Sequence, residues 1–477
     1  MIPRVTLGPD RVRDPTASGP AGGRPGLALL GVCVAVFLAI LDTSLTGLLT
    51  PAIHHDLGGT IAALAWIPNG YVLTYAVLIA SAGVLGDRLG RKPVFIAGVF
   101  TCGLGSLVCA LAPSLAILIA GRVIQGVGAA AMLTIGLALI SVAYPTRRAW
   151  AFSIYVLAAN LGGGLGPILG AVLAQLASWR WAFLAQLPVA AVAIVLTAIA
   201  ARDARGSARR LDLLGVGLIT AAMLLATTGL LKGADWGWAT PGTATCLLGA
   251  VVLGTAFLAW ERHTAEPMLR LSVFQEPTFV AYTMAGVCIW FGVMSLMFYV
   301  AVYLQTQLAL SILGAGLVTL AFPATGALSA SRVSSLVHRH GQERMLVAGL
   351  GLLVVVTFPW IFISREWPIW LFVALLGAFG ITQGLLTSLG SAGALAAFSP
   401  AESGVAAASY NTLRQLAASF GIAATGAFIA AGSGSLRPGS LDIPLGRAFG
   451  FRFLVIAALA AVAVWLLNPR AMRRTGS

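Results

Sequence analysis

Residues 26–51 read GLALLGVCVAVFLAILDTSLTGLLTP, an apolar run in which Asp42 is the one charged residue. The part before Asp42 is apolar enough for a helix that spans a membrane. An ionised carboxylate at that depth is costly in hydrocarbon, so it is expected to face a protein interior or a water-filled cavity. Asp42 therefore marks a functional site within a membrane-spanning segment.

The composition of the whole chain fits the same class. Of its 477 residues, 59% are hydrophobic and 9% are charged, which leaves too little polar surface for a soluble globule. The apolar runs are unbroken over roughly twenty residues, which predicts spanning helices rather than the alternating strands of a barrel. We expect an all-α polytopic membrane protein. A net charge of +14 would indicate nucleic acid in a soluble protein, but the loop positions of the basic residues explain it here, so no nucleic-acid partner is expected.

No motif indicates an enzyme, a metal or a cofactor. The five cysteines lie in apolar spans without metal-ligand spacing and are interpreted as small core residues. Gly126, Gly128 and Ala131 fit the dinucleotide pattern GxGxxA, but this pattern requires a preceding strand. The close cluster His54-His55-Asp56 has no partner motif, and no GxxxxGK[ST] sequence is present. We therefore expect no catalytic residues, no metal and no nucleotide as energy source.

Fourteen apolar runs are long enough to cross a bilayer. They lie near 26–49, 65–86, 93–112, 115–140, 149–173, 181–201, 211–231, 241–260, 278–305, 312–331, 345–364, 367–391, 404–431 and 448–467.

The distribution of basic residues gives the expected orientation. With the N-terminus inside, cytoplasmic segments hold 21 of the 29 Lys and Arg residues, and outer loops hold five. This asymmetry follows the positive-inside rule and places both termini in the cytoplasm. Residues 1–25 are interpreted as a disordered cytoplasmic tail rather than a cleavable signal, and 468–477 as a second tail.

An internal repeat divides the chain into two halves. Arg88-Leu-Gly-Arg91 recurs as Arg339-His-Gly-Gln342, and Gln125-Gly126 recurs as Gln383-Gly384. Two similar helical halves around a central pathway are typical of secondary transporters. The predicted parts are an N-terminal six-helix bundle (26–201), a two-helix insertion (202–265) and a C-terminal six-helix bundle (266–467).

Residues 83–93, GVLGDRLGRKP, form a basic loop at the cytoplasmic end of a helix. The order GxLxDRxGRK resembles the signature of the major facilitator superfamily. In that family this loop latches the two halves together in one state and releases them in the other. The latch residues carried over by this resemblance are Gly83, Asp87, Arg88, Gly90 and Arg91.

Arg122 is the expected partner of Asp42. Asp42 lies roughly 24 Å above the inner face of the membrane and Arg122 roughly 20 Å above it, for a core of about 30 Å. One alternative is an ion pair that is only structural. The other is that Arg122, by approaching or leaving, biases the protonation of Asp42 and so couples transport to protons.

Gly162, Gly166 and Gly170 recur every four residues in the fifth span, with Pro167 between them. Such a stripe lets two helices touch closely, and the proline adds a bend. Generic packing would explain the glycines alone. Together with the Gly-Pro pair they resemble the antiporter motif of exporters in the superfamily.

Several further motifs resemble the fourteen-span drug:proton antiporter branch of the superfamily. They are Leu41-Asp42-x-Ser44 with Pro51, Trp66 with Tyr71, Ser178-Trp179-Arg180-Trp181-x-Phe183 with Pro188, and Asn411-Thr-x-Arg414-Gln415. The resemblance implies two six-helix bundles plus two inserted helices. It also implies a monomeric transporter of the inner or plasma membrane that exports lipophilic drugs, antibiotics or antiseptics in exchange for protons. A proton-coupled importer of a small metabolite is the alternative.

The chain departs from that branch in three respects. It has Gly47 where the family usually has Asn, and Ser44 where it has Thr. Asp42 is the only acid well inside a predicted span, which disfavours a dicationic substrate. Neutral, zwitterionic and singly cationic lipophiles remain open.

Polar residues inside the spans are the candidates for the substrate pocket, although interhelical hydrogen bonds would explain many of them equally well. The candidates are Asn69, Tyr71, Gln125, Asn160, Gln186, Tyr303, Gln383, Asn411 and Arg414. Arg414 lies near mid-membrane by its position in the thirteenth span. It either binds an anionic or polar group of the substrate or caps carbonyls between helices.

Overall fold

The computed structural model describes residues 24–205, 211–264, 267, 269, 271–396, 398, 403–432 and 445–467. Every regular element in these ranges is a helix, which confirms the predicted all-α class. The two predicted tails fall outside the described residues, apart from Arg24 and Pro25.

The first half comprises eight helical segments: α1 (Pro25–Leu57), α2 (Ile61–Leu64), α3 (Trp66–Leu89), α4 (Arg91–Ala110), α5 (Leu115–Ala143), α6 (Arg148–Leu176), α7 (Trp179–Leu184) and α8 (Gln186–Ala200). The insertion comprises α9 (Leu213–Trp236) and α10 (Pro241–His263). The second half comprises η1 (Leu271–Gln275), α11 (Pro277–Thr306), α12 (Ile312–Thr319), α13 (Ala321–His340), α14 (Gln342–Thr357), η2 (Phe358–Phe362), α15 (Ile369–Ala396), α16 (Ser403–Gly432) and α17 (Leu445–Leu466).

These segments account for the fourteen predicted spans. Thirteen stretches of the described chain are long and apolar enough to cross a membrane, counting α2 with α3, α7 with α8 and α12 with α13 as single spans. The helix α16, with 30 residues, is a further one of that length.

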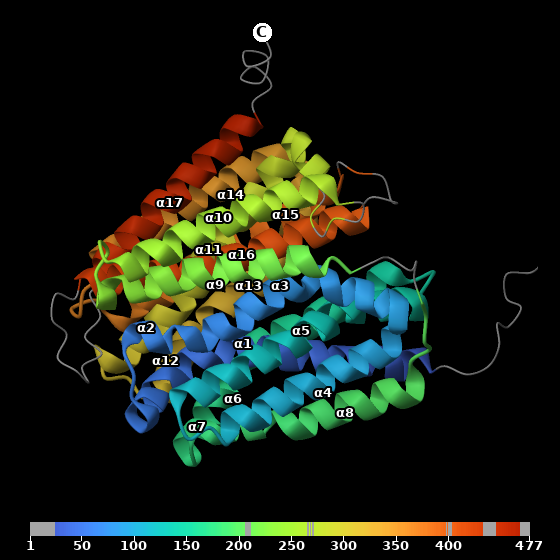
Figure 1. Cartoon of the computed structure of the whole chain (residues 1–477), viewed down its shortest axis with the longest axis horizontal. Coiled ribbons are helices and arrows are strands. Elements are labelled where there is room, and N and C mark those ends of the chain that lie inside the picture. The colour runs from blue at the N-terminus through green and yellow to red at the C-terminus, as the bar shows by residue number, and fades with distance from the viewer. Residues whose placement is uncertain are drawn as a thin grey trace, which may run out of the picture.

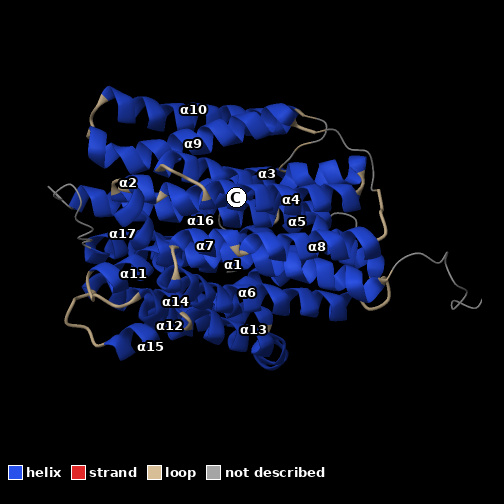
Figure 2. Cartoon of the chain, turned by 90° about the horizontal axis from the view of Figure 1, so that it is seen from below, coloured by secondary structure: helices blue, strands red, loops and turns tan. Residues whose placement is uncertain are grey.

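The halves form two layers, with α1–α8 in the lower part of Figure 1 and α14–α17 in the upper part. They meet where α1 packs on α11, α3 on α16 and α6 on α12. The inserted helices α9 and α10 pack on each other and run along one side of the molecule, where α9 contacts both α3 and α16 (Figure 2). The insertion thus lies beside a contact between the two halves.

The sequence repeat is also a repeat in backbone geometry. Gly90 joins α3 to α4 with φ of +107°, and Gly341 joins α13 to α14 with φ of +83°. Such positive φ angles favour glycine because a side chain would be strained there. In addition, α3 and α13 each follow a short helix that begins at a capping hydroxyl, Thr60 before α2 and Ser311 before α12. Both halves therefore build this helical hairpin in the same way.

The Ser-Trp-Arg motif before the sixth span connects α7 with the end of α1 and with the loop after α4. The Ser178 hydroxyl accepts a hydrogen bond from the Arg180 backbone N–H at the start of α7. Trp179 Nε1 donates to the Asp56 carboxylate at 3.1 Å, and Arg180 forms an ion pair with the same carboxylate. Arg180 also donates to the Ala112 carbonyl at 3.1 Å. Asp56 thereby joins the end of α1 to α7, and Arg180 joins α7 to the loop after α4.

The glycine stripe of α6 is the surface on which α6 touches α1. A methyl group at Gly162 would collide with the Phe37 carbonyl oxygen, and one at Gly166 would collide with the Ser44 hydroxyl. At Gly170 a methyl carbon would lie 2.9 Å from Leu45 Cβ. The stripe therefore brings the backbone of α6 against the turns of α1 that surround Asp42.

We predict that Gly162→Ala lowers the stability of the folded protein, because the new methyl group meets a backbone carbonyl that cannot rotate away. Overpacking of this kind costs about 1–3 kcal/mol. The measurement is the thermal unfolding midpoint of the detergent-purified protein, followed by tryptophan fluorescence. Gly163→Ala is the matched control, since its methyl carbon would lie at an ordinary 3.5 Å from Ile40 Cγ2. Equal midpoints for the two variants would contradict the close packing of α6 on α1.

Candidate functional site

A cavity of about 1020 Å³ lies between the two halves. It is lined by α1, α3, α5 and α6 on one side and by α11, α13, α15 and α16 on the other. Much of the lining is aliphatic, with Val36, Ile40 and Leu133 facing Val293 and Met294. A cavity of this size and character accommodates a drug-sized lipophilic molecule.

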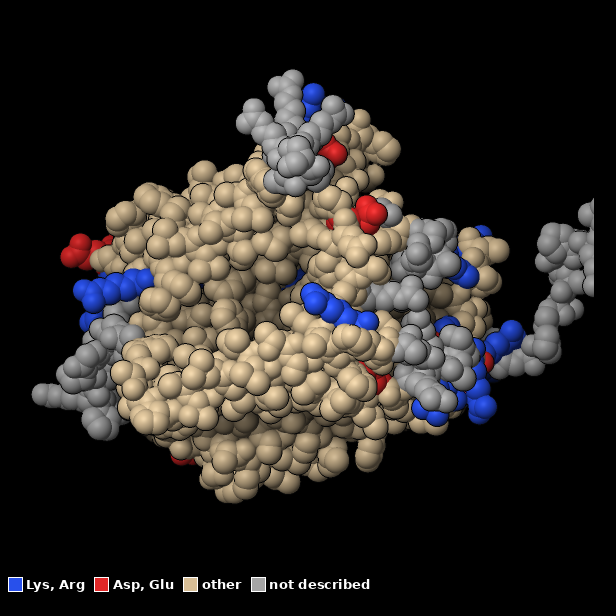
Figure 3. Space-filling view, turned by 45° about the horizontal axis from the view of Figure 1, so that its top comes forward, with Lys and Arg blue, Asp and Glu red and all other residues tan. Residues whose placement is uncertain are grey.

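The cavity reaches toward the end of the helices where the basic loops lie, which we call the basic end (residues 87–92, 147–148, 202–205 and 262). Figure 3 shows Lys and Arg gathered at this end, with a hollow between the two layers. Asp87 and Asp212 line the cavity there. Toward the opposite end, Gln305 Nε2 of α11 donates to the Leu48 carbonyl of α1 at 3.0 Å. The two halves are thus joined beyond the cavity, on the side away from the basic loops.

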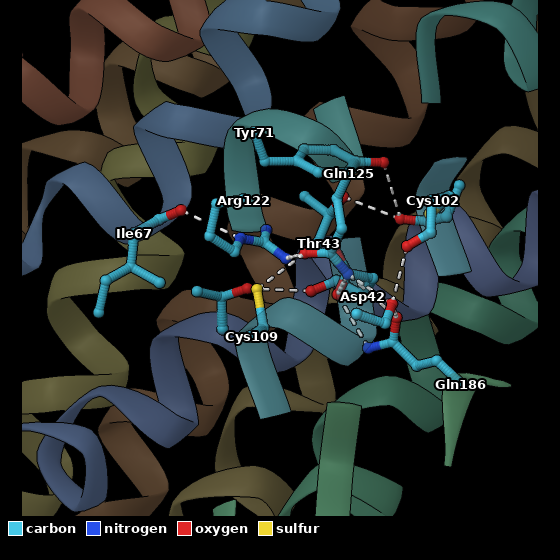
Figure 4. Close-up of polar contacts among 12 residues, drawn as sticks. Asp42, Thr43, Ile67, Tyr71, Cys102, Cys109, Arg122, Gln125 and Gln186 are labelled. Atoms are coloured by element: carbon cyan, nitrogen blue, oxygen red, sulfur yellow. Dashed lines mark hydrogen bonds and ion pairs between the residues drawn. The ribbon is translucent and has the colours of Figure 1, made fainter. Parts of the chain in front are cut away.

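Asp42 and Arg122 form an ion pair in the interior of the N-terminal half (Figure 4). Arg122 NH1 donates to Asp42 Oδ2 at 2.5 Å, and both residues have no exposed surface. Arg122 Nε donates to the Ile67 carbonyl at 3.1 Å, and the guanidinium lies 4.8 Å from the ring centre of Tyr71. The structure therefore places Asp42 and Arg122 in direct contact, as expected from their similar depth in the membrane.

Two glutamines complete the surroundings of the Asp42 carboxylate. Gln125 Nε2 donates to Asp42 Oδ1 at 3.1 Å, and Gln186 Nε2 donates to the same oxygen at 2.9 Å. Gln125 Oε1 accepts from Arg122 at 2.7 Å, so this amide bridges the acid and the base. Ser106 donates to Gln186 Oε1 at 2.8 Å and lies 2.8 Å from Gln125 Nε2. The buried carboxylate thus accepts hydrogen bonds from one guanidinium and two amides.

The predicted pocket candidates separate into two groups. Those that line the cavity are Tyr71, Asn160, Gln383, Asn411 and Arg414. Gln125 and Gln186 instead hold Asp42. Asn69 accepts a hydrogen bond from Ser419 across the halves at 2.9 Å, and Tyr303 packs on Phe372 with 6.2 Å between ring centres.

The predictions based on sequence include neither Ser106 nor Trp290, although both belong to the site. Ser106 of α4 joins the network around Asp42, and Trp290 of α11 lines the cavity. Ser106 gives no signal in the sequence beyond being a polar residue within a span. Trp290 is one of many aromatic residues in the spans, and only the tertiary contact with Arg414 at 4.5 Å distinguishes it.

A family model for the Major Facilitator Superfamily matches residues 32–421 and also 282–476. The chain belongs to the major facilitator superfamily. It is accordingly a multi-pass membrane transporter, as the long apolar helices require.

Proteins of similar sequence carry names that refer to antibiotic resistance and export. The chain is 30% identical over 474 residues to the methylenomycin A resistance protein of Streptomyces coelicolor, with 96% of this chain and 97% of that protein covered. It is 28% identical to the methylenomycin A resistance protein of Bacillus subtilis, with 92% and 94% covered. It is 30% identical to the tetracenomycin C resistance and export protein of Streptomyces glaucescens, with 90% and 80% covered.

The superfamily loop between α3 and α4 is tied to the N-terminal half of this transporter. Asp87 accepts from Arg91 NH2 at 3.0 Å within the loop. Asp203, which follows α8, accepts from the Lys92 backbone N–H at 3.0 Å, and Lys92 Nζ donates to the Ala198 carbonyl at 2.6 Å. A methyl group at Gly90 would lie 2.5 Å from a carboxylate oxygen of Asp203. Asp87 faces the cavity from this loop, while Arg88 is exposed.

We predict that Arg122→Gln destabilises the folded protein by about 3–5 kcal/mol, because it leaves a buried carboxylate without its cation. The double variant Asp42→Asn, Arg122→Gln removes the charge as well and recovers most of that loss. The measurement is the unfolding midpoint of each variant in detergent. Arg91→Gln is the control, since it breaks a partly exposed pair that contributes about 0–1 kcal/mol. A double variant no more stable than Arg122→Gln would contradict a coupled pair.

Proposed function

We propose that this transporter exports a lipophilic small molecule in exchange for protons by alternating access. The observation that carries the proposal is a buried ion pair, Asp42 with Arg122, placed beside an apolar cavity between two repeated halves. The names of the relatives support the direction of transport, since they refer to resistance and export. The cation asymmetry of the loops supports cytoplasmic termini in a plasma membrane.

In this proposal Asp42 carries the proton and Arg122 connects it to the cavity. Arg122 lines the cavity, as do Thr43 and Thr46, which follow Asp42 on α1, whereas Asp42 itself does not. The Asp42 carboxylate accepts a proton only after Arg122 moves away, because the ion pair stabilises the charged form. Displacement of the Arg122 guanidinium thereby links the side to which the cavity is open with the protonation of Asp42.

The substrate drives the exchange by binding the two conformations with different affinity. With the cavity open toward the basic end, Asp42 and Arg122 are paired. Opening toward the opposite end separates the halves where Gln305 meets Leu48, and we propose that this separation lets a proton reach Asp42. The proton gradient is the source of energy, with no cofactor, and a monomer in the bilayer is sufficient.

We predict that Asp42→Asn abolishes efflux driven by a pH gradient, with the rate normalised to the amount of inserted protein because the unpaired Arg122 also lowers stability. The neutral amide cannot exchange a proton, although it fills the same space. The measurement is accumulation of a lipophilic dye in inside-out vesicles after acidification of their interior. Glu366→Gln is the control, because Glu366 is an exposed acid between η2 and α15. Full dye accumulation by the Asp42→Asn vesicles would overturn the coupling role, and accumulation only in right-side-out vesicles would indicate import instead.

We predict that Asp87→Asn slows turnover without weakening substrate binding. Asp87 organises the loop through Arg91, and we expect it to act when the halves exchange partners at the basic end. The measurement pairs the initial rate of efflux with the equilibrium binding of the same dye to purified protein. Weaker dye binding with an unchanged rate would contradict a role in conformational change.

A further inference from the structure

We propose that Arg414 is an anion-binding position of the cavity, and that the exported molecule carries a single anionic group such as a carboxylate. This inference rests on the proposed export function and specifies its substrate class. It starts from the Arg414 guanidinium, which lines the cavity from α16 near the middle of the helix bundle.

The Arg414 guanidinium has no acidic partner within the described residues. Its close contacts are the faces of two aromatic rings, Trp290 at 4.5 Å and Tyr410 at 5.8 Å. Arg414 Nε is buried and donates to no acceptor. The alternative role of capping carbonyls between helices therefore finds no support in the contacts of Arg414.

A second unsatisfied donor lies beside the guanidinium. Trp290 Nε1 is also buried without an acceptor, and Trp290 lines the same cavity. An indole nitrogen and a guanidinium are donors only, so neither can satisfy the other. Two adjacent donors, one of them charged, define a position that requires an acceptor with negative charge.

None of the described acids near the cavity pairs with Arg414, although Asp212 Oδ2, at the basic end, also lacks a partner. Asp42 is bound by Arg122 and two amides, and Asp87 by Arg91. Asp212 accepts from the Gly215 backbone N–H and from Trp260 Nε1, each at 2.8 Å. In the part of the lining that the structure describes, the positive charge of Arg414 is therefore the one left without a counter-ion.

A lipophilic anion fits this arrangement better than a lipophilic cation. A carboxylate can accept two hydrogen bonds from the planar fork of a guanidinium. The apolar body of the same molecule would contact the aliphatic wall formed by residues such as Val293 and Met294. A cation placed there would be repelled by Arg414, with the low-dielectric surroundings strengthening the repulsion.

The test compares two probes that differ in charge and little in shape, anthracene-9-carboxylate and anthracene-9-carboxamide. Their binding to detergent-purified full-length protein is followed by fluorescence anisotropy at neutral pH, where the carboxylate is ionised. We expect wild-type protein to bind the carboxylate about tenfold more tightly than the amide, as one charge-assisted hydrogen bond allows. Arg414→Gln should remove this preference and leave amide binding unchanged. Arg414→Lys, which keeps the charge but loses the fork, should retain part of it.

Arg339→Gln is the matched control, because it removes the same charge from an exposed position on α13 and should leave both affinities unchanged. A wild-type protein without preference for the carboxylate would overturn the proposal. So would an Arg414→Gln variant that keeps the preference, or one that loses affinity for both probes equally. The assay needs no proton gradient, so its outcome is independent of dye transport by Asp42→Asn, which tests coupling.

Discussion

The constraint on which this structure depends is the burial of an ion pair in an apolar helix bundle. Removing two charges from water costs several kcal/mol for each ion, and their attraction compensates only when the remaining hydrogen-bonding groups are satisfied. Here α5 supplies both Arg122 and Gln125, while α8 supplies Gln186. The break between α7 and α8 at Ala185 places Gln186 at the first position of a new helix. Packing around Asp42 is thus organised by the need to satisfy its carboxylate.

The same constraint explains why glycines surround the pair. Side chains from α5 and α8 can bind Asp42 only if α1 keeps a fixed position. The glycine stripe of α6 holds α1 in place by packing on Phe37, Leu41 and Leu45. Between α4 and α5 the approach is equally close, since a methyl group at Gly105 would lie 2.6 Å from Gln125 backbone nitrogen. Glycines occupy the positions where two helix backbones are in contact, and larger polar side chains occupy the positions around Asp42. The small residues and the polar residues of these spans therefore serve one arrangement.

The sequence predicts the helices and the ion pair, because both depend only on the number of residues along each helix axis. Hydropathy defines the spans, and counting residues from each boundary places Asp42 level with Arg122. The sequence does not predict how each helix is rotated about its axis. Many of these helices are apolar on all sides, so periodicity does not tell which face meets the cavity. Polarity alone therefore predicts pocket positions for Gln125 and Gln186, although they bind Asp42 from 83 and 144 residues away in sequence. Neither the cavity contact of Trp290 nor the network position of Ser106 was predictable, for the same reason.

The two halves repeat the backbone but not its charges, and this difference bears on how the transporter works. Gln383-Gly384 of α15 matches Gln125-Gly126 of α5, yet Gly380 stands three residues before Gln383 where Arg122 stands before Gln125. A methyl group at Gly380 would collide with the Phe322 carbonyl, so the second half packs backbone on backbone at the place where the first half holds a cation.

Two cations of the second half, Arg414 and Arg452, lie on aromatic rings instead of acids. The Arg452 guanidinium lies 4.4 Å from the ring centre of Phe449, and Arg414 lies 4.5 Å from that of Trp290. None of the C-terminal cavity-lining residues that the structure describes is acidic. A ring face stabilises a cation more weakly than a carboxylate does and leaves the edge donors available. In the exchange that we propose, the N-terminal half carries the proton, and the C-terminal half presents a charge for which we propose the substrate as counter-ion.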